Sequence, residues 1–153
     1  MRIYLDSCCY NRPFDDLSQE VIRVESEAVL SILTKGLDGE HEIIGSDAIE
    51  YELNQIKDPV KMQNVLDLYQ ESIKLQIDET DEINNRSREI MTLSNIHFLD
   101  SLQVACAEAG NADVMLTTDY KLEKMASHLQ LKLRVVNPVR FVLEELYGTQ
   151  EMK

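Results

Sequence analysis

The stretch that follows Met1 constrains the fold more than any other part of the sequence. The run from Arg2 to Leu5 is too short for a helix, is rich in Ile, Tyr and Leu, and is closed by polar residues and Pro13. This pattern predicts a short buried strand that ends on Asp6. In sheets built from alternating strands and helices, ligands bind just beyond the carboxyl ends of the strands. Asp6 is therefore a candidate functional carboxylate.

The composition indicates a folded globular chain rather than a disordered one. The chain has 153 residues, of which 44% are hydrophobic and 28% charged, enough for one domain with its own core. We expect this domain to cover residues 1–148, followed by a tail at 149–153. No run is apolar enough to span a bilayer and the start lacks a signal-peptide pattern, so we expect a cytoplasmic protein that does not bind membranes.

The charge balance narrows the range of partners. The 28 acidic residues exceed the 15 basic ones, which gives a formal net charge of -13. Such a chain is poorly suited to bind phosphate backbones or anionic membranes unaided. A nucleic-acid partner would need help from metal ions or from a second protein chain.

Strand and helix patterns alternate along the rest of the chain. Apolar residues at helical spacing predict an amphipathic helix that starts near Leu17, includes Val21 and Val24, and ends near Gly36. Further strands are predicted at 42–45, 73–77, 114–118 and 133–136, with helices between them and a C-terminal helix through about Leu146. This alternation predicts an α/β fold, a three-layer α/β/α sandwich with a mainly parallel central sheet of about five strands.

Two further carboxylates are expected at the same edge of the sheet as Asp6. Asp119 closes the predicted strand at 114–118. Asp100 lies in the first turn of the helix that leads into that strand, and such a helix runs antiparallel to the strand, so its first turn lies at the carboxyl edge. The topology therefore brings Asp6, Asp100 and Asp119 together.

A fourth carboxylate is expected from the helix after the second strand. Glu52 lies roughly 60° from the buried Ile49 on a helical wheel, whereas Glu50 lies further towards solvent, so we select Glu52. Asp113 is excluded because it opens the strand that Asp119 closes and so lies roughly 20 Å away. Asp47 is interpreted as no more than a helix cap, a role for which Ser46 is the other candidate.

Four carboxylates in one pocket raise one another's pKa unless a counter-charge is present. A divalent cation supplies that charge. Oxygen ligands suit Mg²⁺ or Mn²⁺, which bind through one or two carboxylates and keep waters or phosphate oxygens in their other positions. Such ions activate water and stabilise charge in a displacement at phosphorus.

These residues resemble the PIN-domain family, with its VapC-like ribonucleases. The resemblance covers nearly the whole chain and is carried by four segments: Tyr4-Leu5-Asp6-Ser7, Ser46 to Glu52-Leu53, Leu99-Asp100-Ser101-Leu102-Gln103-Val104-Ala105, and Thr117-Thr118-Asp119. One departure is Gln103, which stands where many relatives have histidine.

The resemblance implies a Mg²⁺- or Mn²⁺-dependent endoribonuclease that hydrolyses RNA and acts as the toxin of a toxin-antitoxin pair. The metal-binding and catalytic residues that it implies are Asp6, Glu52, Asp100 and Asp119, with Ser7 and Thr118 as supporting polar groups. Its expected partners are single-stranded or looped RNA, an antitoxin protein that presents basic residues, and a second copy of the chain.

Each of these carboxylates also has a purely structural explanation. Asp100 could favour a helix dipole, Asp6 and Asp119 could be turn residues, and Glu52 could be a surface glutamate. Two other functions remain open. An aspartate-nucleophile phosphohydrolase would fit Asp6, although such enzymes often carry a second aspartate where Cys8 stands, and a non-catalytic PIN-like interaction module would keep the sheet without the pocket.

The remaining cysteines and histidines are interpreted structurally. The adjacent Cys8 and Cys9 are assigned to core packing rather than to redox chemistry. The histidines are scattered along the chain and are interpreted as surface or capping residues: His41, His97 and His128.

Overall fold

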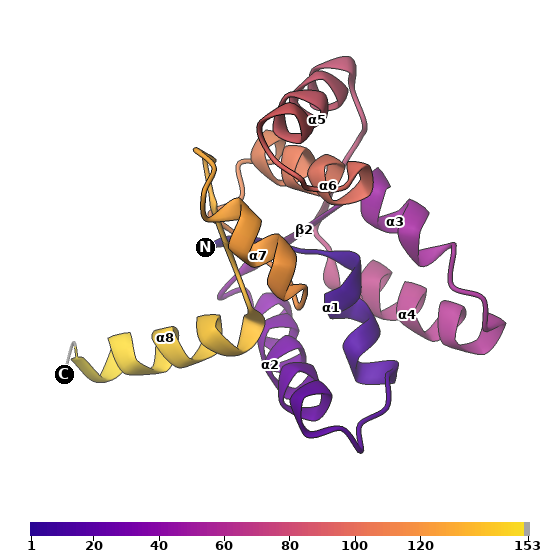
Figure 1. Ribbon diagram of the computed structural model, residues 1–153. Coiled ribbons are helices and arrows are strands. Elements are labelled where there is room, and N and C mark those ends of the chain that lie inside the picture. The colour runs from indigo at the N-terminus through magenta and orange to yellow at the C-terminus, as the bar shows by residue number, and fades with distance from the viewer. Residues whose placement is uncertain (152–153) are drawn as a thin grey trace.

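The computed structural model describes residues 1–151 and has five parallel strands between layers of helices (Figure 1). The strands are β1 (Arg2–Leu5), β2 (Glu42–Ser46), β3 (Leu75–Ile77), β4 (Val114–Leu116) and β5 (Arg134–Val136). Their order across the sheet is β3-β2-β1-β4-β5, and every neighbouring pair is parallel. The predicted α/β sandwich with a parallel five-stranded sheet is confirmed.

The helices cover both faces of this sheet. They are α1 (Ser7–Asn11), the 3-10 helix η1 (Arg12–Phe14), α2 (Glu20–Leu37), α3 (Asp47–Leu53), α4 (Pro59–Ser72), α5 (Asp81–Leu93), α6 (Phe98–Ala109), α7 (Tyr120–Ala126) and α8 (Pro138–Glu151). In Figure 1, α5 and α6 lie above the sheet, α2 and α4 lie below it, and α7 is drawn across the strands. In the strand order, β2 and β3 lie on one side of the central β1, and β4 and β5 lie on the other.

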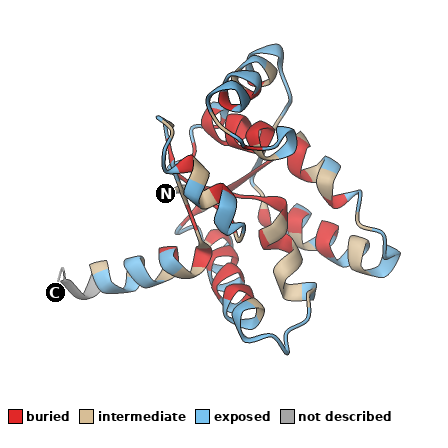
Figure 2. Ribbon diagram, in the orientation of Figure 1, coloured by how far each residue is buried: buried red, intermediate tan, exposed pale blue. Residues whose placement is uncertain are grey.

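The sheet is the centre of the hydrophobic core. Ile3, Tyr4 and Leu5 in β1 have no exposed surface, and all of β4 is buried (Figure 2). The edge strand β3 is only partly covered. Continuous apolar strands in the middle and a mixed strand at the edge are the patterns expected for a parallel sheet covered on both faces.

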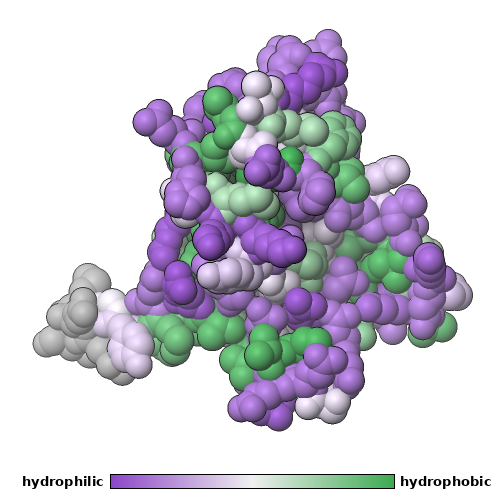
Figure 3. Space-filling model, viewed as in Figure 1, coloured by the Kyte–Doolittle hydropathy of each residue, from purple (hydrophilic) through white to green (hydrophobic). Residues whose placement is uncertain are grey.

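The first predicted helix is wrong in its N-terminal part. The observed helix α2 begins at Glu20, so Leu17 lies before it. Val21 and Val24 are exposed rather than buried. The buried residues of α2 begin at Glu25, whose carboxylate accepts from Arg12 and Asn137, and the hydrophobic core on this helix begins at Val29. Figure 3 shows hydrophobic residues over α2 and α8, and others in the upper part of the molecule, among hydrophilic ones.

The C-terminal helix is longer than predicted. α8 continues to Glu151 instead of ending near Leu146, so the tail expected at 149–153 begins inside the helix, and residues 152–153 lie outside the described residues. The domain boundary at 148 stays a prediction. Within residues 1–151, no helix has both the length and the apolar character to cross a bilayer.

His41 is not the surface or capping residue that the sequence suggested. It is 8% exposed, its Nε2 lies 3.2 Å from Oε2 of Glu145, and its ring packs against Phe141. His97 stands at the N-cap of α6 without a side-chain capping bond, and His128 is exposed.

Candidate carboxylate site

Asp6 is held at the carboxyl end of β1 by backbone and side-chain bonds. Its N–H donates to the carbonyl of Leu116 over 3.0 Å, which fixes it between β1 and β4. Its carboxylate accepts from the Cys9 N–H over 3.3 Å and caps α1. The residue is only 4% exposed. Burial, followed by the nearby Cys8, raises the pKa of Asp6 well above its ordinary value.

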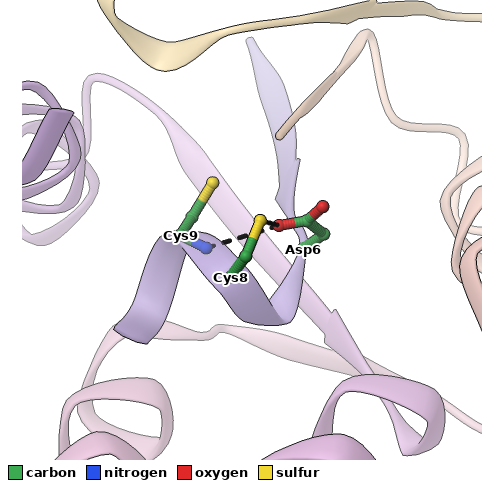
Figure 4. A group of neighbouring side chains, drawn as sticks. All are labelled: Asp6, Cys8 and Cys9. Atoms are coloured by element: carbon green, nitrogen blue, oxygen red, sulfur yellow. Dashed lines mark hydrogen bonds between the residues drawn. The ribbon is translucent and has the colours of Figure 1, made fainter. Parts of the chain in front are cut away.

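Cys8 contacts Asp6 directly, so assigning both adjacent cysteines to the core is wrong for Cys8. Its Sγ lies 2.6 Å from Asp6 Oδ1 (Figure 4), and Thr118 Oγ1 donates to the sulfur over 3.0 Å. Bonds from Cys9, Asp6 and Thr118 lower the pKa of Cys8 to about 6 against the opposing effect of burial. Cys9 is buried in the core, as expected.

Glu52 contacts the residue that follows Asp6 in the chain. Its carboxylate accepts from Ser7 Oγ over 2.7 Å and from Gln103 Nε2 over 2.6 Å, which joins α3 to α1 and α6. α3 starts at this edge because Ser46 ends β2 and caps the helix by accepting from the Ile49 N–H.

Asp100 occupies the first turn of α6, as the sequence predicts. Its pKa is raised to about 6, mainly by burial and then by the charges of Asp119, Glu52 and Cys8, while His97 acts in the opposite direction. Asp119 and Glu52 are therefore close enough to Asp100 to act on its carboxyl electrostatically.

Asp119 stands further from its strand than expected. β4 ends at Leu116, and Thr117 and Thr118 separate it from Asp119, which caps α7 by accepting from the N–H groups of Lys121 and Leu122. Asp119 thus has the capping role of a turn residue and also borders Asp100.

The carboxylates excluded from the site are held elsewhere. Asp113 accepts from the Arg2 N–H over 2.7 Å at the opposite end of β1. Glu50 and Asp47 both accept from Gln76 Nε2, over 2.6 and 2.9 Å, at the β3 side of the sheet. Of the two candidates for the cap of α3, Ser46 has that role and Asp47 does not.

The four predicted site residues lack positive partners. Within residues 1–151, no salt bridge pairs Asp6, Glu52, Asp100 or Asp119 with lysine, arginine or histidine. Their oxygens are not packed as tightly as a closed ligand shell: in this part of the chain, the compact group of potential ligands, with atoms within 4.8 Å of one another, is Asp6, Cys8 and Cys9. The four carboxylates offer the oxygen donors that Mg²⁺ or Mn²⁺ prefers, and such ions bind one or two carboxylates directly and keep several waters.

Two residues of this site were not assigned to it from the sequence. Gln103 follows Asp100 by three positions on α6, a spacing that places both on one helix face and could have identified it. Cys8 gave no such signal, because its approach to Asp6 depends on the turn from β1 into α1.

The sequence matches no protein-family model and no curated protein. Solved structures do match. One chain of VapBC2 from Rickettsia felis, solved bound to a DNA fragment from the promoter, is 18% identical with a TM-score of 0.56 over 90% of this chain and 98% of that chain. One chain of VapBC-1 from nontypeable Haemophilus influenzae is 15% identical, with the same TM-score and coverage.

The protein has a PIN-like fold. At these identities the likeness concerns the arrangement of strands and helices, and it confirms the fold implied by the family resemblance. In this PIN-like fold, Asp6, Glu52, Asp100 and Asp119 all come from the carboxyl edge of the sheet or from helix turns beside it.

Proposed function

We propose that the protein is a metal-dependent endoribonuclease that hydrolyses RNA phosphodiester bonds as the toxin of a toxin-antitoxin pair. The observation that carries this proposal is the environment of Asp100. Its carboxyl is partly buried, the charges of Asp119 and Glu52 raise its pKa more than His97 lowers it, and none of the three carboxylates forms a salt bridge within the described residues. Like charges held close together lower the stability of the folded state. Such a cluster is expected where a cation binds and offsets the repulsion.

The proposed ion is Mg²⁺ or Mn²⁺, held by Asp6, Glu52, Asp100 and Asp119. When bound, it supplies positive charge to the phosphate and favours ionisation of a water. Ser7 and Gln103 keep the Glu52 carboxylate turned towards α1 and α6 through their two hydrogen bonds. Asp6 is anchored at the end of β1, because its backbone N–H is bonded to the carbonyl of Leu116 at the end of β4.

The net negative charge of the chain limits which substrates and partners can bind. A flexible single-stranded RNA can be bent towards an acidic edge more easily than a rigid duplex. Both structural neighbours come from VapBC assemblies, which supports a protein partner for this chain. We propose an antitoxin with basic residues, in which an arginine pairs with two carboxylate oxygens of the site. Association of two copies of the chain is proposed as well.

The test compares RNA cleavage by wild type, Asp6→Asn and Asp100→Asn in Mn²⁺ and in EDTA. Each substitution keeps the side-chain shape but removes the charge that holds the cation, so cleavage should fall by about a hundredfold or more while the circular dichroism spectrum is unchanged.

Glu50→Gln and Asp113→Asn are the matched controls, because both carboxylates are bonded outside the site. Both should cleave like wild type. Cleavage that persists in EDTA or in Asp100→Asn would refute the proposal, and selective loss of cleavage in folded Asp113→Asn would move the active site to the other edge of the sheet.

A further inference from the structure

We propose that Cys8, with Asp6 and Cys9, forms a binding site for a thiophilic divalent cation such as Zn²⁺, and that this cation competes with Mg²⁺ or Mn²⁺ at the carboxylate edge. The competition rests on the proposed nuclease function, whereas the binding site does not. The site differs from the four carboxylates in its ligands, because two of its three donor atoms are sulfur.

The three side chains are already grouped. Their donor atoms, one carboxylate oxygen and two sulfurs, all lie within 4.8 Å of one another. Around a tetrahedral Zn²⁺ with Zn–S of about 2.3 Å and Zn–O of about 2.1 Å, two sulfurs lie about 3.8 Å apart and sulfur and oxygen about 3.6 Å apart. Cys8 Sγ and Asp6 Oδ1 are now 2.6 Å apart, so admitting the ion requires them to separate by about 1 Å.

A cation can approach this group, and neighbouring donors support its sulfur ligand. Asp6 and Cys9 are buried, while Cys8 is only partly covered, so an ion reaches the group over the Cys8 thiol. Thr118 donates to Cys8 Sγ from both its hydroxyl, over 3.0 Å, and its N–H, over 3.4 Å. These donors come from the segment between β4 and α7 and would orient a sulfur ligand, as outer-shell partners do in metal sites.

The chemistry separates the two classes of cation. Mg²⁺ and Mn²⁺ prefer oxygen, whereas thiolate ligands select Zn²⁺ and its relatives. As each S–metal bond forms, the thiol releases its proton to the solvent and no oxidation state changes. One ion at this group would engage Asp6 and so withdraw it from the four-carboxylate site.

The test is a titration of the reduced full-length protein with Cd²⁺, followed by thiolate-to-metal charge-transfer absorption and then by displacement with Zn²⁺. Wild type should show a saturable band that reaches its maximum at one equivalent. Cys8→Ser should lose most of the band and bind Zn²⁺ at least about tenfold more weakly. Cys106→Ala is the matched control, because Cys106 is a buried free cysteine on α6 outside this group, and its band should equal that of wild type.

Cys9→Ser provides a second variant if Cys8→Ser does not fold, and it should also weaken the band. An absent band in wild type, or an undiminished band in folded Cys8→Ser or Cys9→Ser, would overturn the inference. In RNA cleavage with Mn²⁺, added Zn²⁺ should inhibit wild type at about tenfold lower concentration than Cys8→Ser. If no metal supports cleavage but the band behaves as expected, the nuclease proposal fails and the thiolate site stands.

Discussion

Gln103 on α6 donates its Nε2–H to the carboxylate of Glu52 on α3 over 2.6 Å. The same amide nitrogen lies 3.2 Å from Ser7 Oγ, which itself donates to Glu52. Gln103 is 1% exposed, and its Oε1 has no hydrogen-bond partner within the described residues. The hydrogen bonds donated by Nε2 therefore orient the Gln103 amide. Glu52 is held by residues of α1 and α6.

Gln103→Ala should lower both stability and cleavage. Removing a buried donor leaves Glu52 with Ser7 alone, so we expect a loss of about 1–3 kcal/mol in the free energy of unfolding. A Glu52 carboxylate displaced by about 1 Å should cost about a hundredfold in turnover. Gln103→His can still donate one hydrogen bond and should recover part of the activity. Denaturant unfolding and RNA cleavage measure the two effects.

Gln76→Ala is the control for this prediction. Gln76 Nε2 donates to Glu50 over 2.6 Å and to Asp47 over 2.9 Å, which is the same chemistry at the β3 side of the sheet. Its loss should destabilise the fold with a much smaller fall in turnover, because Gln76 reaches the site indirectly, through the Tyr69 hydroxyl, from which its Oε1 accepts over 3.0 Å. Equal loss of turnover in Gln76→Ala and Gln103→Ala would show that the bond to Glu52 has no special role.

Asp100 should make stability depend on pH in the absence of metal. Its pKa is raised from 3.8 to about 6, chiefly by burial. The protonated carboxyl is favoured in the folded state, so its contribution to stability is full below about pH 4 and is lost as the pH rises through about 6. Asp100→Asn cannot ionise, so it should gain stability relative to wild type over this range.

Denaturant unfolding in EDTA at about pH 4 and about pH 7 measures this difference. Added Mn²⁺ should reduce it at the higher pH, because a cation favours the ionised carboxylate. A difference between Asp100→Asn and wild type that is the same at both pH values would contradict the assignment.

Mn²⁺ should raise the melting temperature of wild type. A ligand at a hundred times its Kd stabilises the native state by about 2.7 kcal/mol when it binds only that state. Asp100→Asn should lose most of the shift, whereas Asp113→Asn should keep it because Asp113 is bonded to the Arg2 N–H at the opposite edge. Equal shifts in all three proteins would place the ion outside the carboxylate group.

The sequence predicts the sheet well because its signals are local. The buried run at Arg2–Leu5, the turn after Ser46 and the stripe that ends at Gly110 each reflect one element and its burial. The exposed Val21 and Val24 were misplaced for the converse reason: helical spacing gives the apolar face of a helix but not where along the helix burial begins.

The positions of the site residues follow from topology, but their contacts do not. Parallel strands and their connecting helices must place Asp6 and Asp100 near one edge, which a sequence pattern can predict. The 2.6 Å approach of Cys8 to Asp6 depends on side-chain directions in a tight turn, and the bond from Gln103 to Glu52 joins residues 51 positions apart. Neither contact has a periodic signature.

Gly45 links strand packing to the position of Glu52. A Cβ at this residue of β2 would overlap the hydroxyl of Tyr69 and lie 2.7 Å from two of its ring carbons. The hydroxyl accepts from the Ser46 N–H over 3.0 Å and is within 3.2 Å of the Ser46 carbonyl. Because Ser46 caps the helix that carries Glu52, a displaced Tyr69 should also disturb the site.

Gly45→Ala should therefore lower the free energy of unfolding by about 1–3 kcal/mol, the usual range for an overpacked core, and reduce RNA cleavage as well. Gly148→Ala is the control, because nothing lies within 4 Å of an added Cβ there and alanine favours helix α8. Tyr69→Phe removes the nearest clashing atom, so the double variant should lose less stability than the sum of the two single changes. Strict additivity in that cycle, measured by denaturant unfolding, would show that Gly45 and Tyr69 are not coupled through this contact.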